Sequence, residues 1–306
     1  MDDKSGKLIV RILKALYGLV QSAALWYSAL TTFLKSLGFV ANKIDNCVMN
    51  MRKGGRNMTI VLYVDDILIL SESDNDINWL IGVLRTEYGE LTVETGDQFT
   101  YLGMVLNRID CGKTIELRMD GYIESVLNSF PEYKNLRKAT TPANINLFKS
   151  TKGKLLCNKD KSRFHTTVAR LLYLSKRTRV DIQLPVLYLC TRVREPTTDD
   201  DSKLKRILGY LKLTLKKPRI ITSTGNLRRL VAYVDASFAV HQDGKGHTGL
   251  TIRRGKSTLV SVCKKQKIAT KSSTESELVG LSDVLSEIEK SQEYMEGQGV
   301  MLDVPL

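Results

Sequence analysis

Apolar residues recur every three or four positions near the start of the chain, after a short strand-like opening. This spacing predicts an amphipathic helix over residues 22–37, and Gly38 follows as a helix stop. The apolar stripe of this helix consists of Trp26, Leu30, Phe33, Leu34 and Leu37. A second helix is predicted over residues 74–88.

Strand-forming runs lie between and after these two helices. Two apolar runs within residues 58–70 are interrupted only by Asp65 and Asp66, which predicts a β-hairpin with both acidic residues at its turn. Strands are predicted again around residues 99–107 and 113–118. The beginning of the chain therefore alternates helices with short strands.

The middle of the chain, residues 150–219, is mostly helical by periodicity. Its last part carries one apolar stripe, formed by Leu204, Ile207, Leu208, Leu211 and Leu215. Basic residues occupy other positions of the same segment, namely Lys203, Lys205, Arg206, Lys212, Lys216 and Lys217. The pattern favours a core-packed helix with a solvated basic face, and direct contact with a nucleic-acid backbone is the alternative.

A linker is predicted around Pro218 and residues 223–226. A new unit of strands and one long helix begins after it. The predicted elements of this unit are a strand through Tyr233 and Val234, strands over residues 249–253 and 258–263, and a helix from Ser273. The fold class predicted for the whole chain is α/β.

The amino-acid composition and net charge favour some classes of function but do not identify one. The 306 residues, 42% of them hydrophobic, can bury a substantial core. A formal net charge of +13 favours a polyanionic partner such as nucleic acid, and a soluble basic protein is the alternative. The five cysteines lie far apart, which argues against zinc and for free thiols in a reducing compartment. No segment resembles a signal peptide or a bilayer span, so we expect no membrane association and no secretion.

Asp65 and Asp66 are the first candidates for chemistry. Adjacent carboxylates repel each other, so a cation or solvent must offset their charge. Hard oxygen ligands suit Mg²⁺, and two such ions about 4 Å apart can support nucleotidyl transfer. Taken alone, two adjacent aspartates fit an ordinary turn better. The choice therefore depends on the residues around them.

Several short motifs surround these aspartates in a fixed order. Tyr-Val-Asp-Asp at 63–66 resembles the catalytic box of reverse transcriptases. Leu-Tyr-Gly-Leu-Val-Gln-Ser at 16–22, followed by Leu-Trp-Tyr at 25–27, resembles the box of copia-type retrotransposons that holds the template and the incoming nucleotide. Phe-Thr-Tyr-Leu-Gly-Met at 99–104 resembles the primer-grip strand of that family. The segments at 169–174 (Ala-Arg-Leu-Leu-Tyr-Leu) and 178–182 (Thr-Arg-Val-Asp-Ile) resemble its connection to ribonuclease H.

This resemblance implies a palm-type fold that polymerises DNA on an RNA template. It implies that Asp65 and Asp66 bind Mg²⁺, with Mn²⁺ as the alternative. It also implies that Gln21 lines the nucleotide site and that Tyr63 packs near the primer end. The implied partners are an RNA template, a DNA primer and deoxynucleotides, in a cytoplasmic virus-like particle or in the nucleus.

A second acidic pair lies in the last unit, where Asp235 ends a predicted strand and Glu277 lies early in the predicted helix. At about 100° per residue, Glu277 falls within the apolar arc of that helix, and Glu275 lies opposite. The apolar residues of the arc are Leu281, Val284, Leu285 and Ile288. A carboxylate on a buried stripe needs a cation or a basic partner, and a capping box with Thr274 is the alternative.

Two further motifs bear on this pair. Lys-Lys-Gln-Lys at 264–267 and Ser-Ser-Thr-Glu-Ser-Glu at 272–277 resemble the ribonuclease H of copia-type elements. The resemblance implies that Asp235 and Glu277 bind Mg²⁺ beside the scissile phosphate of an RNA–DNA hybrid. His241 and His247 are expected to be surface residues without a catalytic role.

Each implied site lacks one carboxylate. The palm needs a third on an earlier strand, and Asp2 and Asp3 lack the apolar surroundings of such a strand. The ribonuclease H needs another aspartate on a later strand, and Asp303 has no such strand around it. We therefore expect a fragment with a palm over residues 1–120, a mostly helical thumb and connection over 121–224, and a C-terminally truncated ribonuclease H-like domain over 225–306. We expect this chain alone to be inactive or only weakly active, and a non-catalytic basic nucleic-acid-binding or assembly remnant is the alternative.

Overall fold

The computed structural model describes residues 11, 16, 18–149 and 153–303. The chain divides into two compact units, Met1–Thr92 and Val93–Leu306. The predicted opening strand, Tyr17, Asp2 and Asp3 lie outside the described residues. The domain boundaries predicted at residues 120 and 224 stay predictions.

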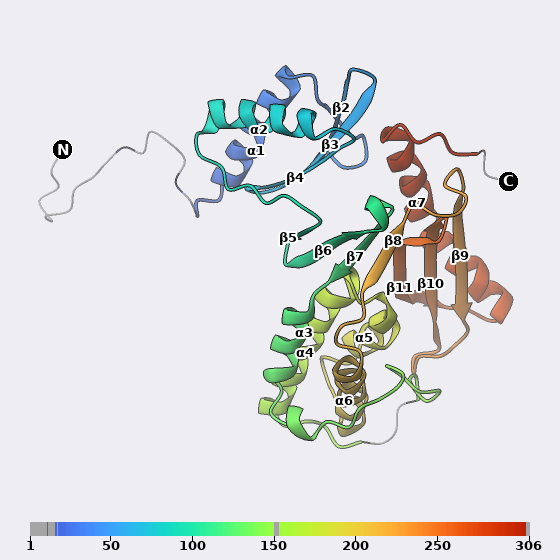
Figure 1. The fold of residues 1–306 in the computed structure, drawn as a ribbon. Coiled ribbons are helices and arrows are strands. Elements are labelled where there is room, and N and C mark those ends of the chain that lie inside the picture. Colours follow the sequence, from blue (N-terminus) through green and yellow to red (C-terminus); the bar gives the residue numbers. More distant parts are fainter. Residues whose placement is uncertain (1–10, 12–15, 17, 150–152, 304–306) are drawn as a thin grey trace, which may run out of the picture. The chain divides into compact units, whose positions relative to one another are not determined.

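The first unit combines two helices with a four-stranded antiparallel sheet (Figure 1). Its elements are α1 (Ser22–Ser36), β1 (Val40–Ala41), β2 (Val48–Lys53), β3 (Arg56–Tyr63), β4 (Asp66–Ser71) and α2 (Asp74–Tyr88). The strand order is β1-β2-β3-β4, so every strand pairs with its neighbour in sequence. The two predicted helices and the predicted hairpin are confirmed, while β1 and β2 were not predicted.

Alternate residues of β3 build the core of this unit. Met58, Ile60 and Leu62 are buried, whereas the residues between them are only partly buried, as expected for a strand with one face on the core. Leu34 of α1 and Leu80 of α2 belong to the same buried cluster. Both helices therefore pack on the face of the sheet that these alternate residues define.

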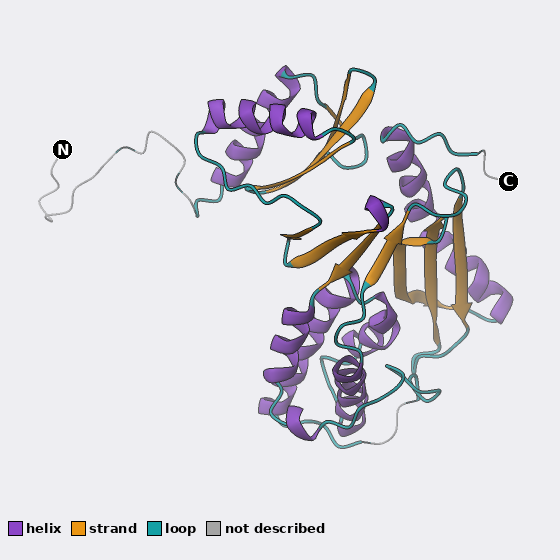
Figure 2. Cartoon of the chain, viewed as in Figure 1, coloured by secondary structure: helices purple, strands orange, loops and turns teal. Residues whose placement is uncertain are grey.

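The second unit contains two antiparallel sheets and most of the helices (Figure 2). Its elements are β5 (Gln98–Tyr101), β6 (Met104–Ile109), η1 (Asp110–Gly112), β7 (Thr114–Arg118), α3 (Asp120–Asn128), η2 (Tyr133–Asn135), α4 (Asn158–Arg177), η3 (Val180–Ile182), α5 (Gln183–Cys190), α6 (Thr198–Leu213), β8 (Arg219–Thr222), β9 (Leu230–Ser237), β10 (Lys245–Arg254), β11 (Ser257–Ala269) and α7 (Ser273–Gly297). Helices and antiparallel sheets are mixed along the chain, so the α/β class is confirmed.

The strand β8 occupies the place between the two predicted linker segments. It pairs with β7, which completes a sheet of order β5-β6-β7-β8. The pairing brings Thr222 opposite Thr114, and their hydroxyl groups are 3.2 Å apart. From the sequence, residues 220–222 were assigned to no element and Arg219 was included in the mostly helical stretch, yet together they form a strand that joins two distant parts of the second unit.

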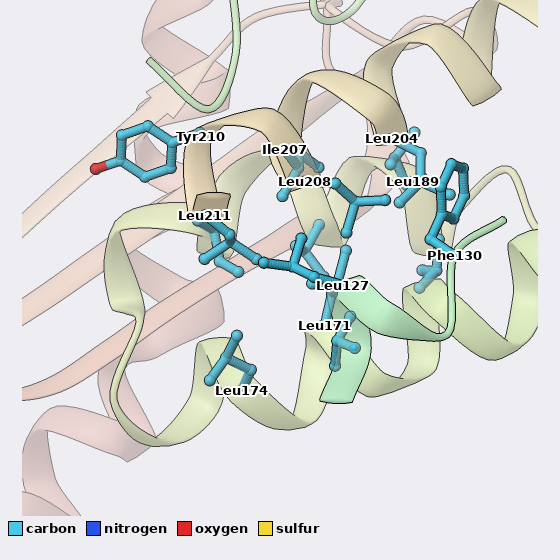
Figure 3. Close-up of a cluster of buried hydrophobic side chains, with 14 of the residues drawn as sticks. Leu127, Phe130, Leu171, Leu174, Leu189, Leu204, Ile207, Leu208, Tyr210 and Leu211 are labelled. Atoms are coloured by element: carbon cyan, nitrogen blue, oxygen red, sulfur yellow. The ribbon is translucent and has the colours of Figure 1, made fainter. Parts of the chain in front are cut away.

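Helices α3 to α6 form a bundle around the largest buried cluster of the molecule (Figure 3). The cluster draws Leu127 from α3, Leu171 and Leu174 from α4, and Leu189 from α5. From α6 it takes Leu204, Ile207, Leu208 and Leu211, with Leu215 packed against it, which confirms the predicted apolar stripe. The absence of polar residues from this stripe explains why periodicity alone identified the helix.

The basic residues of α6 bind groups of the chain itself. The Nζ atom of Lys203 donates to the carbonyl oxygen of Lys149 over 2.7 Å. Lys205 forms an ion pair with Glu132 at 2.7 Å, and Lys212 donates to three main-chain carbonyls at 3.2 to 3.4 Å. The predicted solvated face is thus used largely for internal pairing.

The last sheet, of order β11-β10-β9, carries α7 on one face (Figure 1). A Cβ atom added at Gly280 of α7 would lie 2.9 Å from the Cβ atom of Ala236 on β9. This approach needs a glycine, because real Cβ atoms do not come so close. Val284, one turn later, is fully buried in the small core between helix and sheet. Among the residues that the structure describes, no helix is long and apolar enough to cross a membrane.

A buried ion pair ties the end of α4 to the end of α6. The side chain of Arg179 is 1% exposed and donates from Nε and Nη2 to the carboxylate of Asp181, both over 2.9 Å. It also donates to the carbonyl and hydroxyl of Thr214, and Tyr210 donates to Asp181 over 2.7 Å. Burial alone would raise the pKa of Asp181, but Arg179, Tyr210 and Lys217 outweigh it and lower the pKa to about 2.

We predict that Asp181→Ala lowers the free energy of unfolding by about 3–5 kcal/mol, because it leaves the Arg179 charge buried without its carboxylate. Urea denaturation at neutral pH measures this loss. The matched control is Lys217→Ala, which removes the exposed partner of the same carboxylate and should cost less than about 1 kcal/mol. Equal losses in the two variants would contradict the assignment of the stabilisation to the buried pair.

Candidate functional site

The two candidate aspartates lie at the tip of the β3–β4 hairpin. Tyr63 pairs with Asp66, so Val64 and Asp65 alone form the turn. The side chains of Asp65 and Asp66 are both exposed. The hairpin thus presents two adjacent carboxylates to solvent, as the sequence predicted.

Val64 adopts an unusual backbone conformation in this turn. Its φ angle is +55°, in the left-handed region that a β-branched side chain disfavours. Such a conformation costs on the order of 1–3 kcal/mol and persists only where surrounding structure holds it. The indole Nε1 of Trp26, on α1, donates a hydrogen bond of 2.8 Å to the carbonyl oxygen of Val64.

Trp26 is a residue of this site that sequence reasoning missed. Periodicity assigned it to the apolar stripe of α1, and its ring does pack edge-on against Tyr88, with centroids 5.2 Å apart. The N–H edge of the indole, however, forms the hydrogen bond to the turn at Val64. The place of Trp26 in the Leu-Trp-Tyr motif at 25–27 was a signal for the site, but its bond to a partner 38 residues away is not visible in the sequence.

Gln21 and Tyr63 take different positions around the turn. Gln21 is the N-cap residue of α1 and is exposed. Gln21 therefore lies at the start of the helix whose residue Trp26 donates a hydrogen bond to the turn. Tyr63 is 52% exposed and lies directly opposite Asp66 in the hairpin. The roles that the resemblance implies for Gln21 and Tyr63 stay predictions.

The chemistry of the turn suits a hard divalent cation in part. Exposed carboxylate oxygens are the ligands that Mg²⁺ prefers. Within the described ranges, however, no three His, Cys, Asp or Glu side chains gather as a metal-binding group. The turn therefore offers two carboxylates, fewer than the three that the resemblance requires.

The predicted primer-grip motif forms a tight hairpin in the second unit. Tyr101 of β5 pairs with Met104 of β6. The two residues between them, Leu102 and Gly103, have φ angles of +50° and +74°, as a two-residue turn of type I′ requires. The motif is thus a β-hairpin of its own.

The second candidate pair lies on packed elements, but one side chain is not where we predicted it. Asp235 is exposed on β9, and the next residue, Ala236, faces α7 at Gly280. Glu277 is exposed on α7, so its predicted place on the buried stripe is wrong. The buried residues of this helix are Ser276, Gly280 and Val284. Small residues make the contact with the sheet, while Leu281 and Leu285 remain about half exposed.

The start of α7 also differs from the expectation. Ser272, rather than Thr274, is the N-cap residue, and its hydroxyl accepts from the backbone N–H of Glu275 over 3.2 Å. The carboxylate of Glu275 accepts from the backbone N–H of Lys271 over 2.6 Å. The capping glutamate is therefore Glu275, and Glu277 is left free of that role.

His241 and His247 are buried, and the prediction that they lie on the surface is wrong. They are 7% and 4% exposed, and Nε2 of His241 lies 3.0 Å from Nδ1 of His247. The rings of Phe148 and Tyr188 pack around His241, with centroids 5.3 and 6.1 Å away. The pKa of each histidine is lowered to about 4, mainly by burial. Lys265 contributes to the lowering at His241, where Asp243 opposes it, and His241 contributes at His247.

This pair should make the second unit sensitive to mild acid. Both rings are neutral in the folded chain near pH 6.5, whereas the unfolded chain binds protons as the pH falls below that value. We predict that the free energy of unfolding declines from about pH 6.5 towards pH 4 and that the decline flattens in the double variant His241→Gln, His247→Asn. Chemical denaturation at a series of pH values measures the slope.

The matched control for this prediction is His165→Gln, because His165 is the remaining histidine and is exposed. It should keep the acid slope of the parent chain. An unchanged slope in the double variant would contradict the role of the buried pair.

Comparison with known proteins shows which protein family the sequence resembles. The family model described as reverse transcriptase (RNA-dependent DNA polymerase) matches residues 1–144, which include the β3–β4 turn. All of the chain is 30% identical to part of the retrovirus-related Pol polyprotein from transposon RE1 of Arabidopsis thaliana. Residues 1–144 therefore match the reverse transcriptase family, and the chain as a whole is similar to part of copia-type retrotransposon Pol polyproteins.

Other relatives show how much of such a protein the chain spans. It is 28% identical, over 96% of its length, to the Pol polyprotein from transposon TNT 1-94 of Nicotiana tabacum. The chain spans about a fifth of the length of these polyproteins, 20% for RE1 and 22% for TNT 1-94. A putative transposon Ty5-1 protein of Saccharomyces cerevisiae is 26% identical, and the chain covers 92% of it. No solved structure matches the chain.

Proposed function

We propose that this reverse transcriptase relative carries the polymerase palm of a retrotransposon RNA-directed DNA polymerase, followed by a ribonuclease H-like part. The observation that supports the palm is the exposed Asp65–Asp66 turn, which lies within the segment matched by the family model. The proposed substrates are an RNA template, a DNA primer and deoxynucleotides. The ribonuclease H-like part would act on an RNA–DNA hybrid through Asp235 and Glu277.

The chemistry of the turn follows from its charge. Two adjacent carboxylates repel a triphosphate unless a cation lies between them, so Asp65 and Asp66 are proposed to hold Mg²⁺. When bound, the metal would activate the primer 3′-hydroxyl and stabilise the leaving pyrophosphate. Gln21 would contact the incoming nucleotide, and Tyr63 would pack against the primer end.

Catalysis by this chain alone is proposed to be weak. Among the described residues the turn has no third carboxylate beside it, and the loss of one metal ligand removes several kcal/mol of transition-state stabilisation. Such a loss corresponds to roughly a thousandfold or more in rate. The chain on its own should therefore extend a primer little or not at all.

We predict that the purified chain gives no primer extension above background on an RNA template with Mg²⁺, in an assay run beside Asp65→Asn. Extension that this substitution abolishes would show that the site is complete and would overturn the proposal of a weakened palm. Extension that survives the substitution would show that Asp65 does not bind the catalytic metal.

A non-catalytic nucleic-acid-binding protein is the rival outcome. Retention of nucleic acid without extension, with an affinity that falls steeply as salt rises, would favour it. The same titration with DNA of several sequences shows whether phosphate contacts alone supply the affinity. The net charge of +13 supports this reading weakly, since the lysines of α6 are already paired within the chain.

A further inference from the structure

The carbonyl group of Val64 accepts the hydrogen bond that connects α1 to the Asp65–Asp66 turn. This carbonyl belongs to the peptide unit that joins Val64 to Asp65, so a hydrogen bond to it fixes the orientation of the peptide plane directly before the first aspartate. The donor is Nε1 of Trp26, at 2.8 Å. The indole N–H can only donate a hydrogen bond, and the Val64 carbonyl can only accept one, so the bond has a single possible direction.

The indole is itself held in place. Its ring packs edge-on against Tyr88 at the end of α2, and Tyr88 packs in the same way against Phe33 of α1, with centroids 5.6 Å apart. Tyr88, in the last turn of α2, therefore packs between the indole and Phe33, which lies two turns further along α1, and restricts the movement of the indole. A rigid aromatic donor positioned by packing can hold a backbone group more firmly than a flexible polar side chain can.

The turn needs such support. Val64 is held at a φ angle of +55°, which a β-branched residue leaves readily when nothing constrains it. Relaxation of this residue would rotate the peptide plane before Asp65 and move both carboxylates at the tip. No other side-chain hydrogen bond to the Val64 carbonyl is present among the described residues.

We propose that Trp26 is a positioning residue that sets the geometry of the Asp65–Asp66 turn through its hydrogen bond to Val64. This inference rests on the proposed metal-binding function of the turn. The effect of Trp26 reaches the carboxylates through the backbone of Val64.

The test compares three variants of the full chain by amide hydrogen exchange in the segment 62–67. Trp26→Phe keeps a ring against Tyr88 but removes the donor, and benzothienylalanine at position 26 keeps the bicyclic shape without an N–H group. Trp79→Phe is the matched control, because Trp79 lies under the Nζ atom of Lys53 at 3.3 Å and does not bind the turn. We expect exchange of the amides of Tyr63 and Asp66, which pair across the hairpin, to accelerate about five- to tenfold in the first two variants and to stay unchanged in the third.

A second measurement follows Mn²⁺ binding by electron paramagnetic resonance, with Asp65→Asn as the variant without a site. Weaker Mn²⁺ binding in both Trp26 variants, at unchanged melting temperature, is the expected result. Unchanged exchange of the Tyr63 and Asp66 amides in the benzothienylalanine variant would overturn the role of Trp26, whether or not Trp26→Phe folds. Absence of Mn²⁺ binding in the parent chain would instead overturn the proposed function of the turn, and the exchange data would still decide on Trp26.

Discussion

The register of β3 against β4 determines where the candidate side chains of the first unit lie. Met58, Ile60 and Leu62 must face the core, and a shift by one residue would turn all three towards solvent. With that register fixed, Tyr63 lies opposite Asp66, and two residues remain to reverse the chain. The left-handed conformation of Val64 is thus imposed by the core some distance away. The exposure of the two carboxylates follows from the same packing.

Positive charge has two different uses in this chain. Part of the excess of Lys and Arg satisfies main-chain carbonyls that would otherwise be left without donors. Arg219, for example, donates to the carbonyls of Arg177, Thr258 and Leu259 over 2.7 to 2.9 Å. Buried carbonyls at helix and strand ends need such partners. The net charge of a sequence therefore overstates the charge that remains for an external polyanion.

Elements with strong local periodicity could be predicted from the sequence. The helices α1, α2 and α6, the β3–β4 hairpin and the sheet with α7 all follow from apolar spacing, and the exposed Asp65–Asp66 pair follows from the hairpin. The strand β1 has only two residues, and β2 ends on the polar pair Arg52–Lys53, so neither carries a sustained apolar pattern. The short helix α3 lies, except for its first residue, in the segment 121–224 that was predicted to be mostly helical, but no separate helix was predicted at its position.

What could not be predicted depends on contacts between distant residues. The hydrogen bond from Trp26 to Val64 and the buried histidine pair exist only once separate segments have come together. The face of α7 was wrong for a different reason, because hydrophobicity marks leucines, whereas close packing on β9 selects Ser276 and Gly280. Small residues allow close approach and leave no hydrophobic signal in the sequence.

The late strand β8 has a consequence for the order in which the second unit can assemble. Its partner β7 lies 108 residues earlier, counted from Thr114 to Thr222, and the whole helical bundle lies between them. Closing a flexible loop of that length costs considerable entropy, whereas a folded bundle brings the two ends together in advance. Until β8 pairs with it, the edge of β7 is open to pairing with other strands. During synthesis, this sheet is completed only after every helix of the bundle has been made.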